Sequence, residues 1–162
     1  MLEEGIKIND RYLLLKRIGK GGFSEVWLAK DEQTSISVAL KFYAPGVGLD
    51  DDGIEVFKRE FTLLANLNHT NLLRPSYYDH YEKMPYLVLT YCENGSSLSL
   101  INQIDEERAW LFLRYVSDGL HYLHTNTPPI IHQDIKPDNI LIDSNGRFLI
   151  TYFGISTRIR ST

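Results

Sequence analysis

The chain has 162 residues, of which 43% are hydrophobic and 23% are charged. These fractions are close to the average of globular domains, so they exclude a disordered, collagen-like or low-complexity protein. The net charge of −4 argues against a nucleic-acid surface, which is usually basic, and we expect no nucleic-acid partner.

The sequence carries no feature of a membrane or secreted protein. Its longest apolar runs, such as 86–89, are far shorter than a membrane span. The start, MLEEGIKIND, is acidic and lacks the apolar core of a secretory signal. The single cysteine, Cys92, cannot form an internal disulfide, which favours a reducing compartment. We therefore expect a cytoplasmic protein without a membrane segment.

The first half of the chain has the pattern of a β-sheet with one inserted helix. A glycine-rich stretch, 19–22, joins the first two expected strands as a hairpin loop. After the acidic turn 50–53, apolar residues recur every three or four positions from Ile54 to Leu64, which is the spacing of an amphipathic helix. The five expected strands are 12–18, 26–30, 37–43, 76–81 and 86–91.

The polar stretch 93–97 is the best candidate for a boundary between two lobes. We expect an N-lobe over 1–92 and a partial C-lobe over 93–162. The second part begins with a long helix and ends in a loop-rich segment with short strands. A sheet with one helix, followed by a mainly helical part, is an α+β fold with two lobes. The expected apolar face of the long helix consists of Ala109, Phe112, Val116, Leu120 and Leu123, and the short strands are 140–142 and 148–151.

The first candidate site is the loop between the first two strands, with the pattern Gly19-x-Gly21-x-x-Ser24-x-Val26. Glycines let backbone N–H groups approach a polyphosphate and donate hydrogen bonds to its oxygens. A small residue such as Ser24 keeps the loop low. An ordinary glycine-rich hairpin turn explains the pattern equally well.

The second candidate is Lys41, at the end of the sequence VALK, with Glu60 19 residues further along the chain. A lysine that points inward from a strand can neutralise phosphate oxygens, and a glutamate from a neighbouring helix can hold its ammonium group. The alternative is a pair of surface charges, which is the commoner fate of both residue types.

The third and most specific candidate is the loop HQDIKPDN, 132–139, between two aliphatic runs that we expect to form buried strands. Asp134 can accept a hydroxyl proton, Lys136 can face a phosphoryl group, and Asn139 can offer an amide oxygen to a metal ion. The alternative, a solvated loop without a function, is disfavoured once the two upstream motifs are counted.

In order and spacing these motifs resemble the signature of protein kinase domains, with YFG at 152–154 where that family has Asp-Phe-Gly. The resemblance extends from Tyr12 to the end of the chain, and the Lys-Pro pair at 136–137 resembles the serine/threonine branch. It implies a two-lobe kinase fold with a five-stranded antiparallel N-lobe sheet. It also implies ATP as the nucleotide, Mg²⁺ as the metal, and a protein as the substrate or partner.

The resemblance assigns roles to the candidate residues. Asp134 would be the catalytic base, Lys136 would stabilise the transferred phosphoryl group, and Asn139 would hold magnesium. Lys41 would bind the α- and β-phosphates of ATP and pair with Glu60.

The adenine site follows from the same resemblance. Leu89 would be the gatekeeper, and the backbone of the hinge 90–93 would bind the adenine edge. Cys92 lies in this hinge, although a small buried hydrophobic side chain is the simpler interpretation of it. The full set of nucleotide-binding residues would be Gly19, Gly21, Ser24, Val26, Ala39, Lys41, Leu89, Thr90, Cys92 and Leu141.

Two substitutions depart from the family pattern. Tyr152 replaces the aspartate that chelates magnesium, and a neutral phenol offers only one poor ligand oxygen. Gln133 replaces the arginine that precedes the catalytic aspartate. We therefore expect a kinase-like domain whose phosphoryl transfer from ATP to serine or threonine is impaired. The alternatives are a pseudokinase that acts as a nucleotide-binding or protein-interaction module, and a folding fragment without an independent role.

The sequence ends at Thr162, a few residues into the activation segment of the family. We expect a truncated domain, whether a cut piece, a natural short protein, or a chain that partners complete. The long helix would then lack its usual cover, and exposed apolar faces promote association. We expect self-association through this lower helix face, which carries Phe112, Val116, Leu120 and Leu123.

Overall fold

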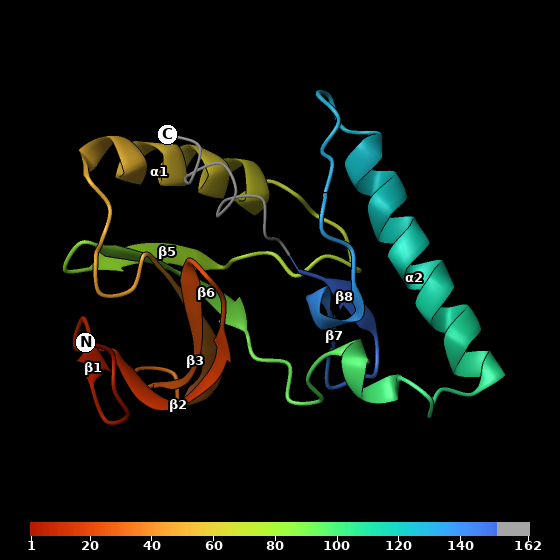
Figure 1. The fold of residues 1–162 in the computed structure, drawn as a ribbon, viewed down its shortest axis with the longest axis horizontal. Helices are drawn as coiled ribbons and strands as arrows, with labels where there is room; N and C mark the ends of the chain where they lie inside the picture. The colour runs from red at the N-terminus through yellow and green to blue at the C-terminus, as the bar shows by residue number, and fades with distance from the viewer. Residues whose placement is uncertain (152–162) are drawn as a thin grey trace. The chain divides into compact units, whose positions relative to one another are not determined.

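A computed structural model describes residues 1–151, except for the side chain of Glu60. The described residues form two units, and Figure 1 shows the elements of each. The first unit contains 1–66 and 75–91, and the second contains 67–74 and 92–151. No helix in this part of the chain is long and apolar enough to cross a membrane.

The first unit is built on an antiparallel sheet with the strand order β1-β2-β3-β4-β6-β5. All five expected strands are present. The sixth, β1, has only two residues, which is too short for an alternating pattern to be recognised in the sequence. The strands are β1 (Lys7–Ile8), β2 (Tyr12–Lys20), β3 (Ser24–Asp31), β4 (Ile36–Tyr43), β5 (Tyr77–Tyr81) and β6 (Met84–Thr90).

The two faces of this sheet carry different kinds of side chains. Successive side chains of a strand point to opposite faces, and directly paired residues share a face. One face carries the hydrophobic core, in which Leu40 and Phe42 of β4 are fully buried. Lys41 lies between them in sequence and therefore on the other face. The core side chains are Leu2, Ile8, Tyr12, Leu14, Trp27, Ala29, Leu40, Phe42, Met84, Tyr86 and Val88.

The helix α1 (Asp51–Ala65) packs in the first unit on the face that carries Lys41. Its N-terminus is capped by the side chain of Asp50, which accepts a hydrogen bond of 2.9 Å from the backbone N–H of Gly53. Phe57 of the helix is fully buried, and its ring lies 5.1 Å from that of Tyr43 on β4. The expected amphipathic helix is therefore confirmed, and aromatic rings join it to the sheet.

The second unit pairs a long helix, α2 (Glu106–His124), with a two-stranded sheet of β7 (Ile140–Ile142) and β8 (Phe148–Ile150). Two short 3₁₀ helices, η1 (Ser97–Leu100) and η2 (Pro137–Asn139), complete it.

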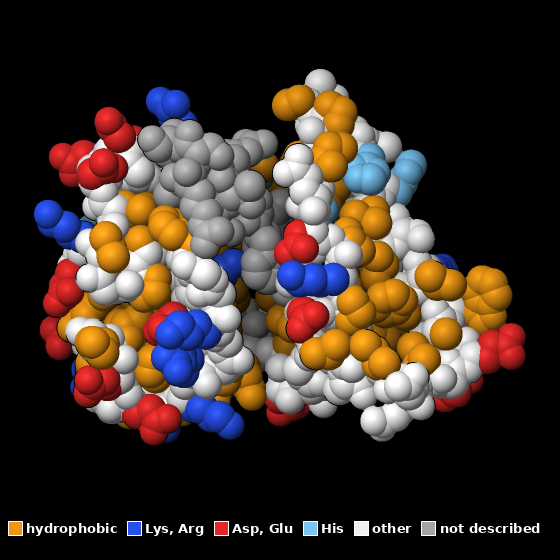
Figure 2. All heavy atoms as spheres, viewed as in Figure 1, with side chains coloured by type: hydrophobic (Ala, Val, Ile, Leu, Met, Phe, Trp, Pro, Cys, Tyr) orange, Lys and Arg blue, Asp and Glu red, His pale blue; other side chains and the backbone are white. Residues whose placement is uncertain are grey.

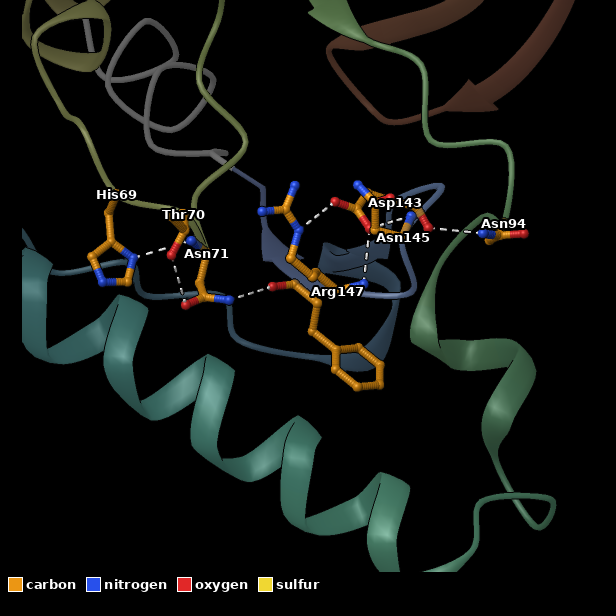
Figure 3. Close-up of polar contacts among 8 residues, drawn as sticks. His69, Thr70, Asn71, Asn94, Asp143, Asn145 and Arg147 are labelled. Carbon is orange, nitrogen blue, oxygen red and sulfur yellow. Dashed lines mark hydrogen bonds and ion pairs between the residues drawn. The ribbon is translucent and has the colours of Figure 1, made fainter.

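The segment 67–74, which follows α1 in sequence, belongs to the second unit and lies along β8. The backbone N–H of Ile150 donates to the carbonyl of Asn71 at 2.8 Å, and the N–H of Leu73 donates back to Ile150 at 2.9 Å. The side-chain amide of Asn71 also donates to the carbonyl of Phe148 at 3.1 Å, as Figure 3 shows. The sequence indicated only a break here, because a single strand-like bridge leaves no periodic pattern.

The expectation of an uncovered face on α2 is wrong. Val116 and Leu123 are buried, and the ring of Phe112 meets that of Phe148 edge-on at 5.1 Å. The helix packs so closely on β8 that a Cβ atom at Gly119 would lie 2.8 Å from Ile150. Strand β8 therefore covers much of the predicted face, on which Phe112 and Leu120 are half-buried.

The exposed apolar side chains of α2 lie elsewhere on the helix. Trp110 is 65% exposed and Leu113 is 53% exposed. Figure 2 shows hydrophobic side chains on the outer surface over α2 and η1, where Leu98 and Ile101 are also exposed.

Candidate functional site

The loop 132–136 is held in place mainly from its C-terminal side. It leads directly into η2 and β7, whose residue Ile140 is fully buried. The upstream aliphatic pair does not form the expected strand, and Ile131 is exposed. The expectation of buried strands on both sides is therefore correct only downstream, because 130–131 pairs with no neighbouring strand among the described residues.

The structure brings Asp134, Lys136 and Asn139 together. The ammonium group of Lys136 lies 3.2 Å from the carboxylate of Asp134. The side-chain amide of Asn139 donates to the same carboxylate at 2.8 Å and to the backbone carbonyl of Asp134 at 2.7 Å. The hydrogen bond from Lys136 has the largest effect and lowers the pKa of Asp134. Burial opposes it, but the bond from Asn139 and the nearby positive charge of Lys136 lower the pKa further, so the net shift is downward. Asp134 is therefore a carboxylate at neutral pH.

Asn139 is buried, and its amide orientation is fixed by these two donated bonds. The nitrogen faces Asp134, so the oxygen Oδ1 is the side-chain atom with acceptor capacity for another group. Amide oxygens are among the ligands that magnesium accepts. The backbone carbonyl of Asn139 accepts bonds from Thr151, from the N–H at 2.9 Å and from the hydroxyl at 3.1 Å.

His132 is a positioning residue that the sequence analysis missed. Its Nδ1 accepts a bond of 3.2 Å from the backbone N–H of Asp134, and its Nε2 lies 2.6 Å from the carbonyl of Thr151. A carbonyl only accepts, so the proton of the neutral imidazole is on Nε2. The buried ring thus links the loop to the residue after β8. A histidine beside a polar loop was a usable signal, whereas the bonds that Thr151 donates go to a backbone carbonyl and leave no signal in the sequence.

Gln133 takes a left-handed backbone conformation, with φ of 68°. Non-glycine residues adopt this region rarely and at an energetic cost. The residue directly before Asp134 is therefore held in a strained conformation, and the bonds of His132 and Asn139 on either side hold the loop in place.

In the first unit, Gly19, Val26 and Lys41 share one face of the sheet. Gly19 pairs with Val26 between β2 and β3, and Val26 pairs with Lys41 between β3 and β4. Ala39, two residues before Lys41, shares this face and pairs with Leu89 on β6. Ser24, two residues before Val26 on β3, shares this face as well. The sheet register therefore brings six of the predicted nucleotide-binding residues onto the same surface, opposite the hydrophobic core.

Lys41 is only 3% exposed, and this burial lowers its pKa to about 7. Its ammonium group lies 5.0 Å from the centre of the Tyr43 ring. The predicted pairing with Glu60 lies outside the described side chains, as do Tyr152, Phe153 and Gly154.

The glycine-rich loop closes with a bond of 2.7 Å from the N–H of Gly21 to the carbonyl of Ser24. A Cβ atom at Gly19 would come no closer than 3.5 Å to Val26, and one at Gly21 no closer than 3.4 Å to Ser24. These are ordinary contacts, and neither glycine has a positive φ. The hairpin itself therefore does not require glycine at these two positions.

The residues of the predicted hinge belong partly to the first unit and partly to the second. Leu89 and Thr90 end β6 in the first unit, with Leu89 half-buried and Thr90 exposed, whereas Cys92 and Leu141 belong to the second. Burial raises the pKa of Cys92 to about 11, so its thiol is neutral, as expected for a small apolar side chain. Ser96 forms a bridge with Leu141, which ties the chain after the hinge to β7.

A second polar network, drawn in Figure 3, also ties the chain after the hinge to the hairpin of β7 and β8. The side-chain amide of Asn94 donates to the carbonyl of Asp143 at 2.8 Å. The carboxylate of Asp143 accepts bonds from the backbone N–H of Asn145 at 2.9 Å and from the guanidinium of Arg147 at 2.8 Å. Burial raises the pKa of Asp143, but the bonds from Arg147 and Asn145 outweigh this effect and lower it. The turn between β7 and β8 is thus fixed by a charged group that is well paired.

Comparison with known proteins agrees with these features. The family model of the protein kinase domain matches residues 12–162. Aurora kinase B-A of Xenopus laevis is 34% identical over 156 residues, which cover 94% of this chain and 42% of that protein. The serine/threonine-protein kinase PrkC of Bacillus subtilis is 34% identical over 163 residues, which cover 98% of this chain and 24% of that protein. The chain therefore spans less than half the length of these relatives.

Proposed function

The chain belongs to the protein kinase domain family, of the serine/threonine type, and from this premise we propose that it binds ATP but transfers its phosphoryl group poorly. The observation that carries the proposal is the arrangement of the catalytic loop, in which Lys136 and Asn139 both contact the carboxylate of Asp134.

Each residue of the loop suits one part of phosphoryl transfer. The carboxylate of Asp134 can accept the proton of a serine or threonine hydroxyl and orient that hydroxyl. The ammonium group of Lys136 can neutralise charge on the transferred group. Asn139 has an amide oxygen for Mg²⁺, and a bound Mg²⁺ would neutralise phosphate charge.

The proposed nucleotide site in the first unit consists of the shared face of the sheet. Val26, Ala39 and Leu89 offer apolar side chains to an adenine ring, and Lys41 offers a positive charge to phosphates. The glycine-rich loop, which does not need its glycines to fold, offers backbone N–H groups to the same phosphates.

The proposed impairment comes from Tyr152. A phenol has a pKa near ~10 and is neutral at pH 7, so it is a much weaker Mg²⁺ ligand than the carboxylate of the family. Asn139 would be left as the main side-chain ligand. Phosphoryl transfer depends mostly on positioning and on charge neutralisation by the metal, so the loss should affect transfer more than nucleotide binding.

Isothermal titration with ATP, once with Mg²⁺ and once with EDTA, tests the proposal. We expect weak binding with nearly the same dissociation constant in both conditions. No detectable binding in either condition would overturn the nucleotide-binding proposal. A large gain of affinity on adding Mg²⁺ would show instead that the metal site is intact.

The second candidate function is that of a pseudokinase that acts through protein contacts. The observation that favours it is the same substitution at position 152, together with the exposed apolar side chains Trp110 and Leu113 on α2. It differs from the first candidate in one measurable respect, since a pure interaction module retains its partner when the Lys41→Met variant no longer binds ATP.

A further inference from the structure

Tyr43 lies two residues after Lys41 on β4, so the two side chains share a face of the sheet. The ammonium group of Lys41 is 5.0 Å from the centre of the Tyr43 ring, and both side chains are buried. We propose that Tyr43 is a positioning residue, whose ring face holds the ammonium group of Lys41 in place for the phosphates of ATP. The inference rests on the proposed function and adds a residue to its site.

The ring of Tyr43 is itself held in a fixed orientation. The ring of Phe57 on α1 meets it edge-on, at 5.1 Å and with 64° between the ring planes. The ring of Phe57 in turn lies 6.2 Å from that of Tyr78 on β5. A cation is attracted to the negative face of an aromatic ring, and this attraction is larger where water is excluded. The helix α1 therefore orients the ring that in turn orients Lys41.

The hydroxyl of Tyr43 does not explain why this residue is here. Among the buried side-chain nitrogen and oxygen atoms of the described residues, it is the one without a hydrogen-bond partner. An unpaired buried hydroxyl destabilises the folded state, so phenylalanine would fill the position at lower cost. The useful part of the side chain is the ring, which lies against both Lys41 and Phe57.

The side chains next to Lys41 on the neighbouring strands are apolar, so an aromatic ring can contribute to stabilising its charge. Its paired neighbours on β3 and β6 are Val26 and Leu87, which carry no charge. Of the other titratable groups on this face, Tyr78 lies beyond Leu87 on β5, with His80 two residues further along that strand. Lys30 is four residues from Val26 on β3, and Glu60 of α1 has a side chain outside the described ones. Burial lowers the pKa of Lys41 to about 7, so a contact that favours the charged form promotes phosphate binding at neutral pH.

Three substitutions separate the ring from the hydroxyl and from general packing. Tyr43→Phe keeps the ring, Tyr43→Leu removes it, and Tyr12→Leu is the matched control. Tyr12 is a buried tyrosine of the same unit, on the core face of the sheet, with its own cation, Arg11, at 4.8 Å. The dissociation constant for ADP without metal is measured by titration calorimetry. The side-chain NMR signal of Lys41 is followed against pH on protein with isotope-labelled lysine, and the pH at the midpoint of its titration is measured.

We expect Tyr43→Phe to match the parent protein within about twofold in affinity, because a cation binds the ring and not the hydroxyl. Tyr43→Leu should weaken ADP binding by roughly 3- to 30-fold and move the Lys41 midpoint down by about 0.5–1 pH unit. Tyr12→Leu should change the dissociation constant for ADP by no more than about twofold and the Lys41 midpoint by no more than about 0.2 pH unit. This should hold even if it lowers the melting temperature as much as Tyr43→Leu does.

Equal effects of Tyr43→Leu and Tyr12→Leu would overturn the inference, and so would a Tyr43→Phe variant that behaves like Tyr43→Leu. If Tyr43→Leu fails to fold, fluorinated phenylalanine at position 43 takes its place. Fluorine weakens the negative ring face and keeps the shape, so the Lys41 midpoint should fall with each added fluorine, and an unchanged midpoint contradicts the inference. If the parent protein binds no ADP, the proposed function fails, while the NMR midpoint, which needs no nucleotide, still decides the role of Tyr43.

Discussion

The two candidate lysines, one in each unit, lie in opposite surroundings. Lys41 is on a central strand of the first unit and is buried beside an aromatic ring. Lys136 is in a loop of the second unit, and about half of its side chain is exposed beside an equally exposed Asp134. In the first unit the charge is placed by sheet register and packing. In the second it is placed mainly by contacts between residues at most five positions apart, in a loop that His132 links to Thr151.

This difference determines which perturbations each region should feel. The state of a buried charge depends on packing by residues that are distant in sequence and on its own pKa. Its side chain also has few alternative conformations. An exposed pair is screened by water and salt, and many of its conformations have similar energy. The first unit should therefore respond strongly to changes far from Lys41 in sequence, and the loop mainly to changes within it or at its contacts with Thr151.

The largest expected effect comes from removing the aromatic contact between α1 and the sheet. Phe57→Ala deletes a fully buried ring and should lower the free energy of unfolding by about 3–5 kcal/mol, measured by urea denaturation. Arg59→Ala, at an exposed position of the same helix, should change it by no more than about 0.5 kcal/mol. Similar effects of the two substitutions would mean that α1 does not depend on the sheet.

The next effect is a dependence of stability on pH that comes from Lys41. Its pKa is about 7 in the folded chain, and an unfolded lysine has a pKa near ~10.4, so the unfolded state binds more protons between these values. Stability should rise with pH across this window, by on the order of 1 kcal/mol per pH unit. Lys41→Met should remove this contribution. Lys30→Met, at an exposed position of β3, should retain it, and an unchanged slope in Lys41→Met would contradict the assignment.

The sequence predicted the parts of the molecule that are coded locally. The five longer strands, both helices and the meeting of Asp134, Lys136 and Asn139 follow from periodicity and from residues close in the chain. The two-residue strand β1 and the attachment of segment 67–74 to β8 did not, because each depends on pairing with a distant strand.

The burial of side chains could be predicted only in part. The apolar stripe of α2 was predicted to be an uncovered face that associates with another chain, whereas the contact with β8 buries much of it. The position of Tyr43 against Lys41 also left no pattern, since alternate residues of any strand share a face. The environment of Lys41 therefore depends on the tertiary structure, whereas that of Lys136 is mostly local.

A smaller effect tests the metal site. Tyr152→Asp restores a carboxylate at the position where the family has one, so ATP affinity should increase by about tenfold in Mg²⁺ and not in EDTA. Tyr152→Asn is the matched control, because asparagine is similar in size to aspartate but uncharged, and it should show a smaller gain of ATP affinity in Mg²⁺. Phosphoryl transfer that appears in Tyr152→Asp should disappear again when Asp134→Asn is added, because the base that orients the hydroxyl is lost. A gain that is the same with EDTA would contradict the assignment of position 152.

The smallest expected effect belongs to the exposed pair itself. The pKa of Asp134 is lowered first by Lys136, so Lys136→Gln should move the titration midpoint of this carboxyl upward, measured by carbon NMR of the side chain. A carboxyl with a lowered pKa stabilises the folded state above its unfolded value of about 3.9 and loses that contribution as the pH falls. Because half of each side chain is exposed, the loss should stay well below 1 kcal/mol and shrink further in 0.5 M salt. Asn139→Ala removes the second donor, which is buried, and should shift the same midpoint with little dependence on salt. Equal salt dependence in the two variants would contradict the distinction between an exposed charge and a buried hydrogen bond.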